Sequence, residues 1–121
     1  MKVRFVGVKD YPQHVRQGAN GFHEGQVWPV LEAYFSVDGP NQLRIETIEG
    51  EGPGLYDSRL FEIVDPTLSS VWCCSIDADG SLTFAPEAWL VPGFWEQFFD
   101  QVPDAIDTFE IGRRAVLADS E

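Results

Sequence analysis

Residues 71–76 read VWCCSI, residues 81–84 read SLTF, and the four residues between them, 77–80, read DADG. Two short apolar runs on either side of an Asp- and Gly-rich turn are typical of a β-hairpin. Gly80 supplies the positive φ that such a tight turn requires. We therefore predict a hairpin here. The pattern before it indicates strands, and the pattern after it indicates helices.

Short strand-like runs precede the hairpin, separated by turns rich in Gly, Pro and Asn. They lie at residues 3–8, 26–35, 43–48 and 60–64. Pro29 implies a sheet edge or a bulge in the second run, because proline has no N–H to donate to a strand ladder. Strands at roughly ten-residue spacing indicate a small antiparallel barrel or sheet. Loops are expected at residues 10–25, 38–41 and 50–54.

Two helices are expected after the hairpin. In residues 94–99, FWEQFF, aromatic side chains recur four residues apart, which places them on one broad helix face. Pro103 suits the first turn of a second helix. The apolar spacing of that helix comprises Ala105, Phe109, Gly112 and Val116, beside Ile106.

Strands followed by helices predict an α+β fold. The length of 121 residues is typical of one domain. We therefore expect a single domain over residues 1–121, with barrel-like strands in residues 1–66 and the hairpin plus helices packed on them in residues 67–121. Whether the hairpin extends the barrel or forms a separate lobe is left open by the sequence.

The charge of the chain is strongly negative and unevenly distributed. The chain has 8 Lys and Arg residues against 20 Asp and Glu residues, a net charge of −12. Residues 61–112 contain no Lys or Arg and carry ten of the acidic residues. Nucleic acids and anionic membranes bind basic surfaces, so this composition argues against both as direct partners. A basic protein partner remains open, because a negative field speeds the encounter with one; the alternative is a solubilising face.

The composition and the cysteines favour the cytoplasm. No apolar run approaches the ~20 residues that span a bilayer, and the apolar stretch at the N-terminus stops at Lys9, before it reaches signal-peptide length. Cys73 and Cys74 are adjacent and would point to opposite faces of a strand, so a mutual disulfide is not expected. We therefore expect a cytoplasmic protein without structural disulfides.

Three segments of the first half resemble small bacterial SH3-like barrel modules. They are GQVWPVL at residues 25–31, LRI at 43–45 and SRLFEIV at 58–64. The chain departs from that pattern at Gln26, where a lysine is expected. The resemblance implies that the predicted antiparallel barrel or sheet is SH3-like.

The second half is similar to the C-terminal part of small bacterial immunity proteins that accompany secreted or contact-delivered toxins. The similar segments are PEAW at residues 86–89, PGFWEQFFD at 92–100 and PDA at 103–105. The chain departs from the pattern at Val102, where a small polar residue is expected. The resemblance implies a protein that binds and neutralises a cognate toxin, and it supplies no catalytic residue.

The spacing of the reactive residues disfavours catalysis and metal binding. Residues 77–81 begin like a calcium-binding EF-hand loop, but Leu82 and Ala88 stand where that loop needs Gly and Glu. Adjacent cysteines on a strand diverge, so a zinc site that combines them with His14 and His23 is disfavoured. Nothing in the sequence fixes a cysteine–histidine pair for nucleophilic catalysis. We expect no catalytic residue, no metal site and no cofactor.

The sequence therefore predicts a non-enzymatic inhibitor that covers the active site of a basic toxin, for example a nuclease whose phosphate-binding positions the carboxylates would occupy. The carboxylates of the segment without Lys or Arg would steer and pair with the partner. They are Asp77, Asp79, Glu87, Glu96, Asp100, Asp104, Asp107 and Glu110. Trp89 or Trp95 would be the apolar anchor if partly exposed; the alternative is that both belong to the core.

Other function classes stay open at this stage. A phage-encoded inhibitor of a host defence system would use the same acidic surface. An SH3-like adaptor or scaffold would bind through a groove in the barrel half around Trp28, Tyr34 and Tyr56. An enzyme would need a deep pocket with convergent polar groups, and no such set is recognisable in the sequence.

Overall fold

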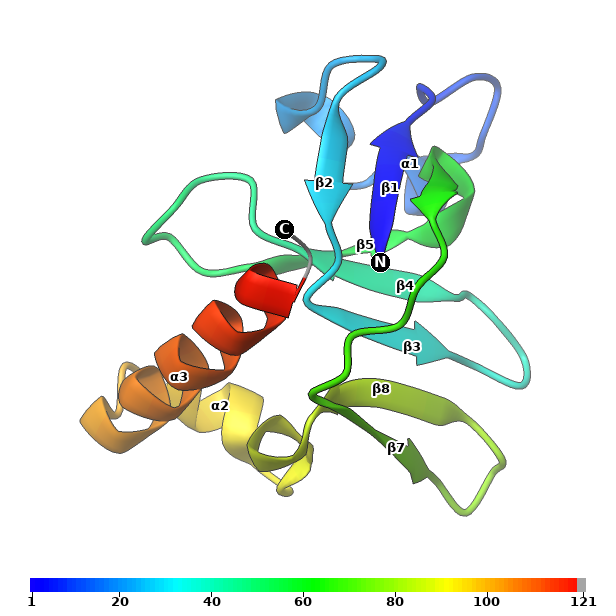
Figure 1. The fold of residues 1–121 in the computed structure, drawn as a ribbon. Coiled ribbons are helices and arrows are strands. Elements are labelled where there is room, and N and C mark those ends of the chain that lie inside the picture. The colour runs from blue at the N-terminus through cyan, green and yellow to red at the C-terminus, as the bar shows by residue number, and fades with distance from the viewer. Residues whose placement is uncertain (120–121) are drawn as a thin grey trace.

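A computed structural model describes residues 1–119, which form two antiparallel sheets and a C-terminal helical layer (Figure 1). The smaller sheet has the order β2–β1–β6, formed by Val27–Pro29, Lys2–Phe5 and Phe61–Asp65. The larger sheet has the order β5–β4–β3–β8–β7, formed by Gly54–Asp57, Gln42–Ile45, Glu32–Phe35, Leu82–Pro86 and Trp72–Ile76. The predicted α+β class is confirmed. Residues 120 and 121, the end of the predicted domain, lie outside the described part of the chain.

The second predicted strand is in fact two strands in different sheets. β2 ends at Pro29, which has no N–H to continue the ladder. Val30 and Leu31 are buried, and their N–H groups donate to the carbonyls of Met1 and Arg44 respectively. The chain therefore crosses from the smaller to the larger sheet at these two residues. The strands of residues 1–119 form two sheets and no closed barrel.

The predicted hairpin is present and extends the larger sheet. β7 pairs with β8, and β8 pairs in turn with β3, where Ala33 lies opposite Phe84. In the turn, the N–H of Gly80 donates to the carbonyl of Asp77 at 2.9 Å, and Gly80 has the expected positive φ of 90°. The hairpin is thus continuous with the first-half strands through backbone hydrogen bonds.

The predicted loop at residues 10–25 contains short elements that the sequence pattern did not indicate. They are α1 (Gln13–Arg16) and a 3-10 turn at Ala19–Gly21. Val15 and Phe22 are buried there and belong to the core. β5 was also missed, because four residues at a sheet edge are too few to establish an alternation. A further 3-10 turn, Ser58–Leu60, joins β5 to β6.

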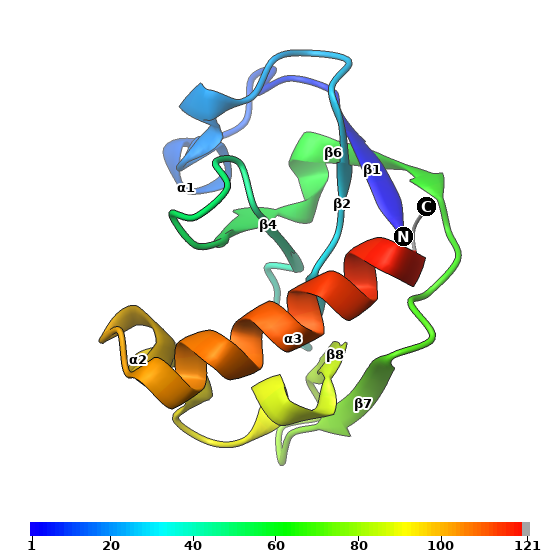
Figure 2. The same cartoon turned by 60° about the vertical axis from the view of Figure 1, so that its left-hand side comes forward.

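The helical layer consists of a 3-10 turn, η3 (Glu87–Leu90), followed by α2 (Phe94–Phe99) and α3 (Pro103–Asp119). Figure 2 shows α3 between the smaller sheet and the β7–β8 hairpin. Its buried residues are Ala105, Phe109, Gly112 and Val116, as their spacing predicted, whereas Ile106 beside them is 40% exposed.

The core consists of two hydrophobic clusters. The first joins strands of both sheets to the first loop and includes Val3, Phe5, Phe22, Ile45 and Leu60. The second joins the helical layer to the larger sheet and comprises Leu31, Ala85, Trp89, Phe94, Ala105, Phe109 and Val116. Trp72 packs against both clusters, and its indole Nε1 donates to the carbonyl of Leu31 at 2.9 Å. This shared residue fixes the helical layer to the sheets.

Candidate functional site

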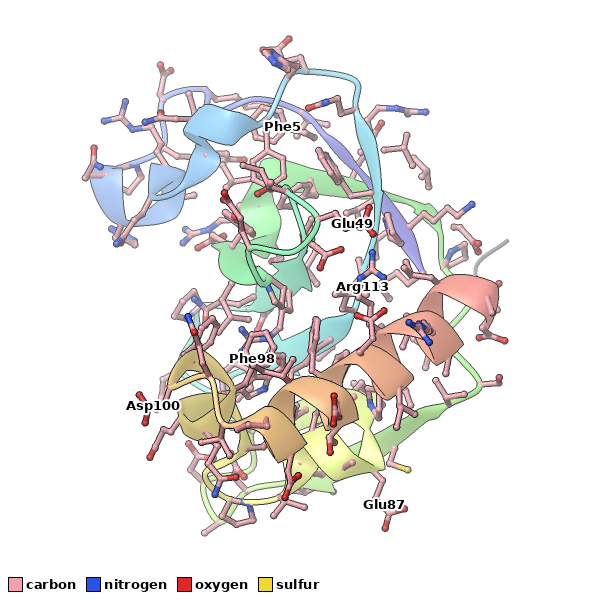
Figure 3. The ribbon with its side chains drawn as sticks, turned by 90° about the vertical axis from the view of Figure 1, so that its left-hand side faces the viewer. Phe5, Glu49, Glu87, Phe98, Asp100 and Arg113 are labelled. Atoms are coloured by element: carbon pink, nitrogen blue, oxygen red, sulfur yellow. The ribbon has the colours of Figure 1, made fainter. Side chains whose placement is uncertain are left out.

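A groove of about 460 Å³ lies between the loop that joins β4 to β5 and the helices α2 and α3. Figure 3 shows Glu49, Phe98 and Arg113 around it. Its walls include four carboxylates, those of Glu46, Glu49, Glu51 and Glu110. Its floor includes the apolar side chains of Phe98, Phe99, Ile106 and Phe109. We call these eight residues, with Arg113, the acidic groove.

α3 presents one row of side chains to the groove. Ile106, Glu110 and Arg113 are four and three residues apart, so they share one face of the helix. This face lies next to the buried face that carries Phe109 and Gly112. The packing of α3 on the core therefore fixes which polar residues face the β4–β5 loop.

Glycines allow the β4–β5 loop to approach α2 closely. Gly50 and Gly52 have φ of 89° and 83°, a left-handed conformation that costs glycine little. A Cβ at Gly52 would lie 3.2 Å from Cε2 of Phe98 and 3.6 Å from Cε1 of Phe99. The loop that carries the groove's glutamates therefore lies directly against the aromatic residues of α2.

The apolar floor is only partly covered. Phe99 is 55% exposed and Ile106 is 40% exposed, whereas Phe109 is buried and Phe98 is half-buried. The ring centroid of Phe98 lies 4.5 Å from that of Phe109 and 5.1 Å from that of Phe99. The aromatic cluster thus extends from the core to the surface, where Phe99 and Ile106 present apolar area to solvent.

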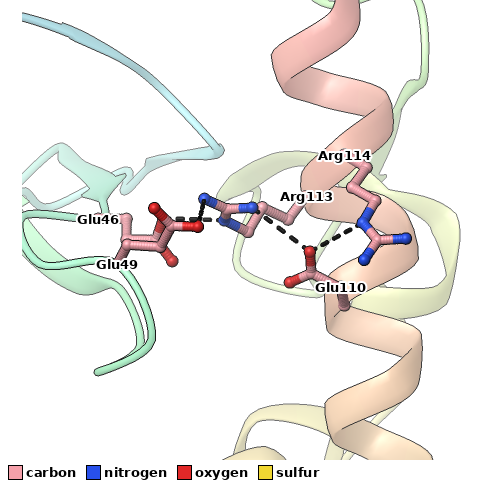
Figure 4. Close-up of polar contacts among 5 residues, drawn as sticks. All are labelled: Glu46, Glu49, Glu110, Arg113 and Arg114. Atoms are coloured by element: carbon pink, nitrogen blue, oxygen red, sulfur yellow. Dashed lines mark hydrogen bonds and ion pairs between the residues drawn. The ribbon is translucent and has the colours of Figure 1, made fainter.

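A single guanidinium holds the two walls together (Figure 4). Nε of Arg113 donates to Oε1 of Glu46 at 2.8 Å, and its terminal nitrogens lie 3.4 Å from Glu110 and 3.6 Å from Glu49. Nε of Arg114 donates to the same oxygen, Oε1 of Glu110, at 3.0 Å. The hydrogen bond with Glu46 raises the pKa of Arg113 above its ordinary value, so this group stays charged.

The groove keeps an excess of negative charge. Four carboxylates line it against the one guanidinium of Arg113. Glu51 forms no ion pair with any residue in 1–119, and the side chain of Glu49 is 86% exposed although it lies near Arg113. These two glutamates of the β4–β5 loop are therefore open to a cation from outside the chain.

The acidic residues predicted as contacts divide among several places. Glu110 lies in the acidic groove. Four others are exposed at the adjoining ends of α2 and α3 and form no ion pair within the described chain; we call Glu96, Asp100, Asp104 and Asp107 the helix-end carboxylates. Gln101, which follows Asp100, lines the groove, so this set adjoins it.

Three predicted contacts lie elsewhere. Asp77 and Asp79 are at the tip of the β7–β8 hairpin, which Figure 1 shows on the opposite side of the molecule from α2. Glu87 begins η3, and Figure 3 shows it well away from Glu49. The segment without Lys or Arg therefore does not fold into one acidic surface, and its hairpin acids are separate from the groove.

The predicted tryptophan anchors are engaged within the fold. Trp89 is 2% exposed and stacks between Phe94 and Phe109, so it lies in the core, which is the alternative that the sequence left open for it. Trp95 is half-buried, and the guanidinium carbon of Arg44 lies 3.7 Å from its ring centroid. Phe99 is the exposed aromatic residue of this region.

Sequence reasoning missed the contribution of the β4–β5 loop. Glu46, Glu49 and Glu51 lie outside residues 61–112, the segment from which the contacts were predicted. The signal that was present is the run of acids without Lys or Arg between Arg44 and Arg59, interleaved with glycines. Which helix that loop faces depends on tertiary packing and is not encoded in its own pattern.

The other candidates from the sequence are the two cysteines, a metal site and the predicted adaptor groove. Cys73 and Cys74 are free thiols on the exposed edge strand β7. Residues 1–119 contain no group of three or more His, Cys, Asp or Glu side chains placed to hold a metal ion. Trp28 and Tyr56 of the predicted adaptor groove pack against Phe22 in the first cluster, with ring centroids 5.6 and 4.7 Å away.

Comparison of the chain with protein-family models, with curated proteins and with solved structures found no match in any of the three. No helix within residues 1–119 has the length and apolar character needed to cross a bilayer.

Proposed function

We propose that this chain is a non-enzymatic acidic inhibitor of the immunity type, which binds a cognate basic toxin in the bacterial cytoplasm and covers its active site. The observation that carries the proposal is the acidic groove, where exposed apolar area is bordered by carboxylates that outnumber the local cations. The resemblance of the segments between residues 86 and 105 to immunity proteins favours the same function.

The arrangement of apolar and charged groups supports a role as a protein-binding site. Tight interfaces have an apolar, often aromatic centre and a polar rim. Here Phe99 and Ile106 supply exposed apolar area, the loop glutamates line the same groove, and the helix-end carboxylates lie at the adjoining ends of α2 and α3. A partner that covers this area would remove the apolar side chains from water while the rim pairs with its cations.

The charge balance sets the character of the partner. The net charge of −12 creates a negative field that steers a basic protein and repels an acidic one. A nuclease or other enzyme that acts on a polyanion binds phosphates through basic residues. Carboxylates presented at those positions would occupy the substrate site, so a basic nuclease is the toxin class that this surface suits best.

The test is neutralisation of the protein encoded beside this chain. We would express the neighbouring open reading frame in a bacterial host, with and without this chain, and measure growth. Arrest by the neighbour and recovery with this chain, together with a stable complex of the purified proteins, is the expected result. A neighbour that is harmless, or that still arrests growth in the presence of this chain, would contradict the proposal.

Covering of the active site has its own kinetic signature. With the purified toxin and its substrate, this chain should raise the apparent KM and leave kcat unchanged, because substrate and inhibitor compete for one site. A fall in kcat at constant KM would replace occlusion by an allosteric mode of inhibition.

A further inference from the structure

We propose that the acidic groove receives one arginine side chain of the partner, with its methylene stem on Phe99 and Ile106 and its guanidinium between Glu49 and Glu51. This inference rests on the proposed function and deepens it, because it states which group of the partner enters the groove. Four features of the described residues carry it: the apolar floor, the unbalanced carboxylates, the size of the groove and an internal example of the same contact.

The floor suits a side chain that is apolar along its length and charged at its end. Long basic side chains lay their methylene groups on apolar surface while the charged group stays near water or carboxylates. Phe99 and Ile106 are 55% and 40% exposed and lie beside the glutamates of the loop. A purely apolar occupant would leave those carboxylates next to a desolvated surface without a counter-charge.

The loop glutamates that line the groove lack a sufficient cation within residues 1–119. Arg113 is committed to Glu46 at 2.8 Å and Glu110 at 3.4 Å, and its contact with Glu49 is longer, at 3.6 Å. Glu51 has no ion pair with residues 1–119. A second guanidinium at this position would supply the missing charge, and the groove volume of about 460 Å³ gives it space.

The same fold already contains an arginine bound by an aromatic ring and a carboxylate. The guanidinium carbon of Arg44 lies 3.7 Å from the ring centroid of Trp95, and its Nε donates to Glu32 at 2.5 Å. An arginine stacks on a ring face and pairs with carboxylates through a planar fork of donors. Lysine carries a compact ammonium without such a fork, so arginine is the better occupant of a groove that combines Phe99 with two glutamates.

The proposal is tested with the full chain and a small probe, Nα-acetyl-arginine amide, by amide chemical-shift titration. The expected result is a saturable shift at Gly50, Gly52 and Phe99 with a millimolar dissociation constant. The citrulline analogue has the same length without the charge and should not bind. An equal response to citrulline, or to Nα-acetyl-lysine amide, would overturn the assignment of arginine.

Two charge-matched variants locate the site. Glu49→Gln/Glu51→Gln removes two carboxylates from the groove, and Asp77→Asn/Glu87→Gln removes two exposed ones far from it. The groove variant should bind the arginine probe at least about tenfold more weakly, while the control variant binds as the parent chain does. Equal weakening in both variants, or shifts spread over the whole surface, would show a general charge effect and would refute the groove as the site.

A growth assay separates this inference from the proposed function. If the parent chain neutralises the neighbouring toxin and Glu49→Gln/Glu51→Gln neutralises it equally well at limiting expression, the arginine site is refuted and the inhibitor function stands. If the groove binds the arginine probe but the parent chain neutralises no toxin, the proposed function is refuted instead. Circular dichroism of both variants checks that these exposed substitutions preserve the fold.

Discussion

The α-carbon of Gly112 in α3 lies directly against the indole of Trp89. A methyl group at Gly112 would stand 2.8 Å from Cε2 and Nε1 of the indole and 2.9 Å from Cζ2. Those distances are shorter than any ordinary carbon contact, and the indole itself is fixed between Phe94 and Phe109. The absence of a side chain at position 112 therefore allows α3 to approach the second cluster and to place its groove face beside the β4–β5 loop.

Gly112→Ala should destabilise the protein although alanine is the better helix former. The helix preference favours alanine by about 0.8–1.0 kcal/mol, but overpacking against a fixed ring costs about 1–3 kcal/mol, so the clash wins. We expect a lower urea midpoint at unchanged slope. Ile111→Ala is the control, because Ile111 is 72% exposed on the same helix and should change the unfolding free energy by less than about 0.5 kcal/mol.

The origin of the effect is tested by a double-mutant cycle. Trp89→Phe removes the indole nitrogen and the fused ring that Gly112 faces. The cost of Gly112→Ala should then be smaller than in the parent chain, which appears as a coupling free energy between the two positions. Costs that simply add would mean that the clash with Trp89 is not the cause.

The residue spacing of α3 shows which structural features can be predicted from a contiguous stretch of sequence. Ala105, Phe109, Gly112 and Val116 were predicted as its buried face and are buried, because a helix of this length displays its periodicity within one segment. The hairpin was predicted for a similar reason, since its turn residues and its paired strands are contiguous in the chain. The change of sheet after Pro29 was missed, because proline marks a sheet edge without saying where the chain goes next.

The acidic groove could not be predicted from contiguous stretches of sequence. It exists because Gly52 lies against Phe98, a contact between segments more than forty residues apart in the sequence. Phe98 and Phe99 are neighbours with the same residue type, and only the packing of α2 decides that the second is exposed. The same holds for Trp89, whose burial depends on the glycine of another helix.

A buried ion pair lies within the larger sheet, between Glu32 of β3 and Arg44 of β4, and both residues contact Trp95 of α2 in the helical layer. Glu32 and Arg44 are 5% and 7% exposed and paired at 2.5 Å, and Glu32 also accepts a hydrogen bond from Nε1 of Trp95 at 3.4 Å. Burial lowers the pKa of Arg44, and the charge of Glu32 opposes that shift. Loss of either charge would leave the other buried without a partner.

Glu32→Gln should therefore destabilise the fold by about 3–5 kcal/mol, the usual cost of breaking a buried pair from one side. The comparison is Glu62→Gln, which breaks the exposed pair with Arg4, whose side chains are 44% and 53% exposed, and which should cost less than about 1 kcal/mol. Urea unfolding at pH 7 measures both. Similar costs for the two variants would contradict a special role for the buried pair.

The ionisation of Asp57 makes the stability of the fold depend on pH in the acidic range. Its carboxylate accepts hydrogen bonds from the side chain of Arg59 at 2.8 and 3.0 Å, and these lower its pKa. Because the folded pKa lies below the unfolded value of about 3.9, the stabilisation is fully present above that value and is lost as the pH falls through the folded pKa. Asp57→Asn should be less stable than the parent chain at pH 7, and the difference should shrink towards pH 2 in urea titrations.

Arg59 provides the check on that explanation. Arg59→Gln removes the guanidinium that lowers the pKa of Asp57 while it keeps the carboxylate. The pH dependence that separates the parent chain from Asp57→Asn should be reduced in this variant. A full pH dependence in Arg59→Gln would assign the lowered pKa of Asp57 to the backbone N–H of Arg59, which also donates to its carboxylate at 2.9 Å, and not to the guanidinium.

Steering of the partner should depend on where the negative charge lies. Asp100→Lys/Asp104→Lys reverses two helix-end carboxylates beside the acidic groove, and Asp77→Lys/Glu87→Lys reverses two exposed carboxylates away from it, so the net charge changes equally. Charges near an interface act mainly on the association rate, and salt screens them. In stopped-flow measurements with the basic toxin at low salt, the first variant should associate several-fold more slowly than the second, and the difference should diminish as salt is added. Equal rates for the two variants would place the contact surface outside the α2–α3 region.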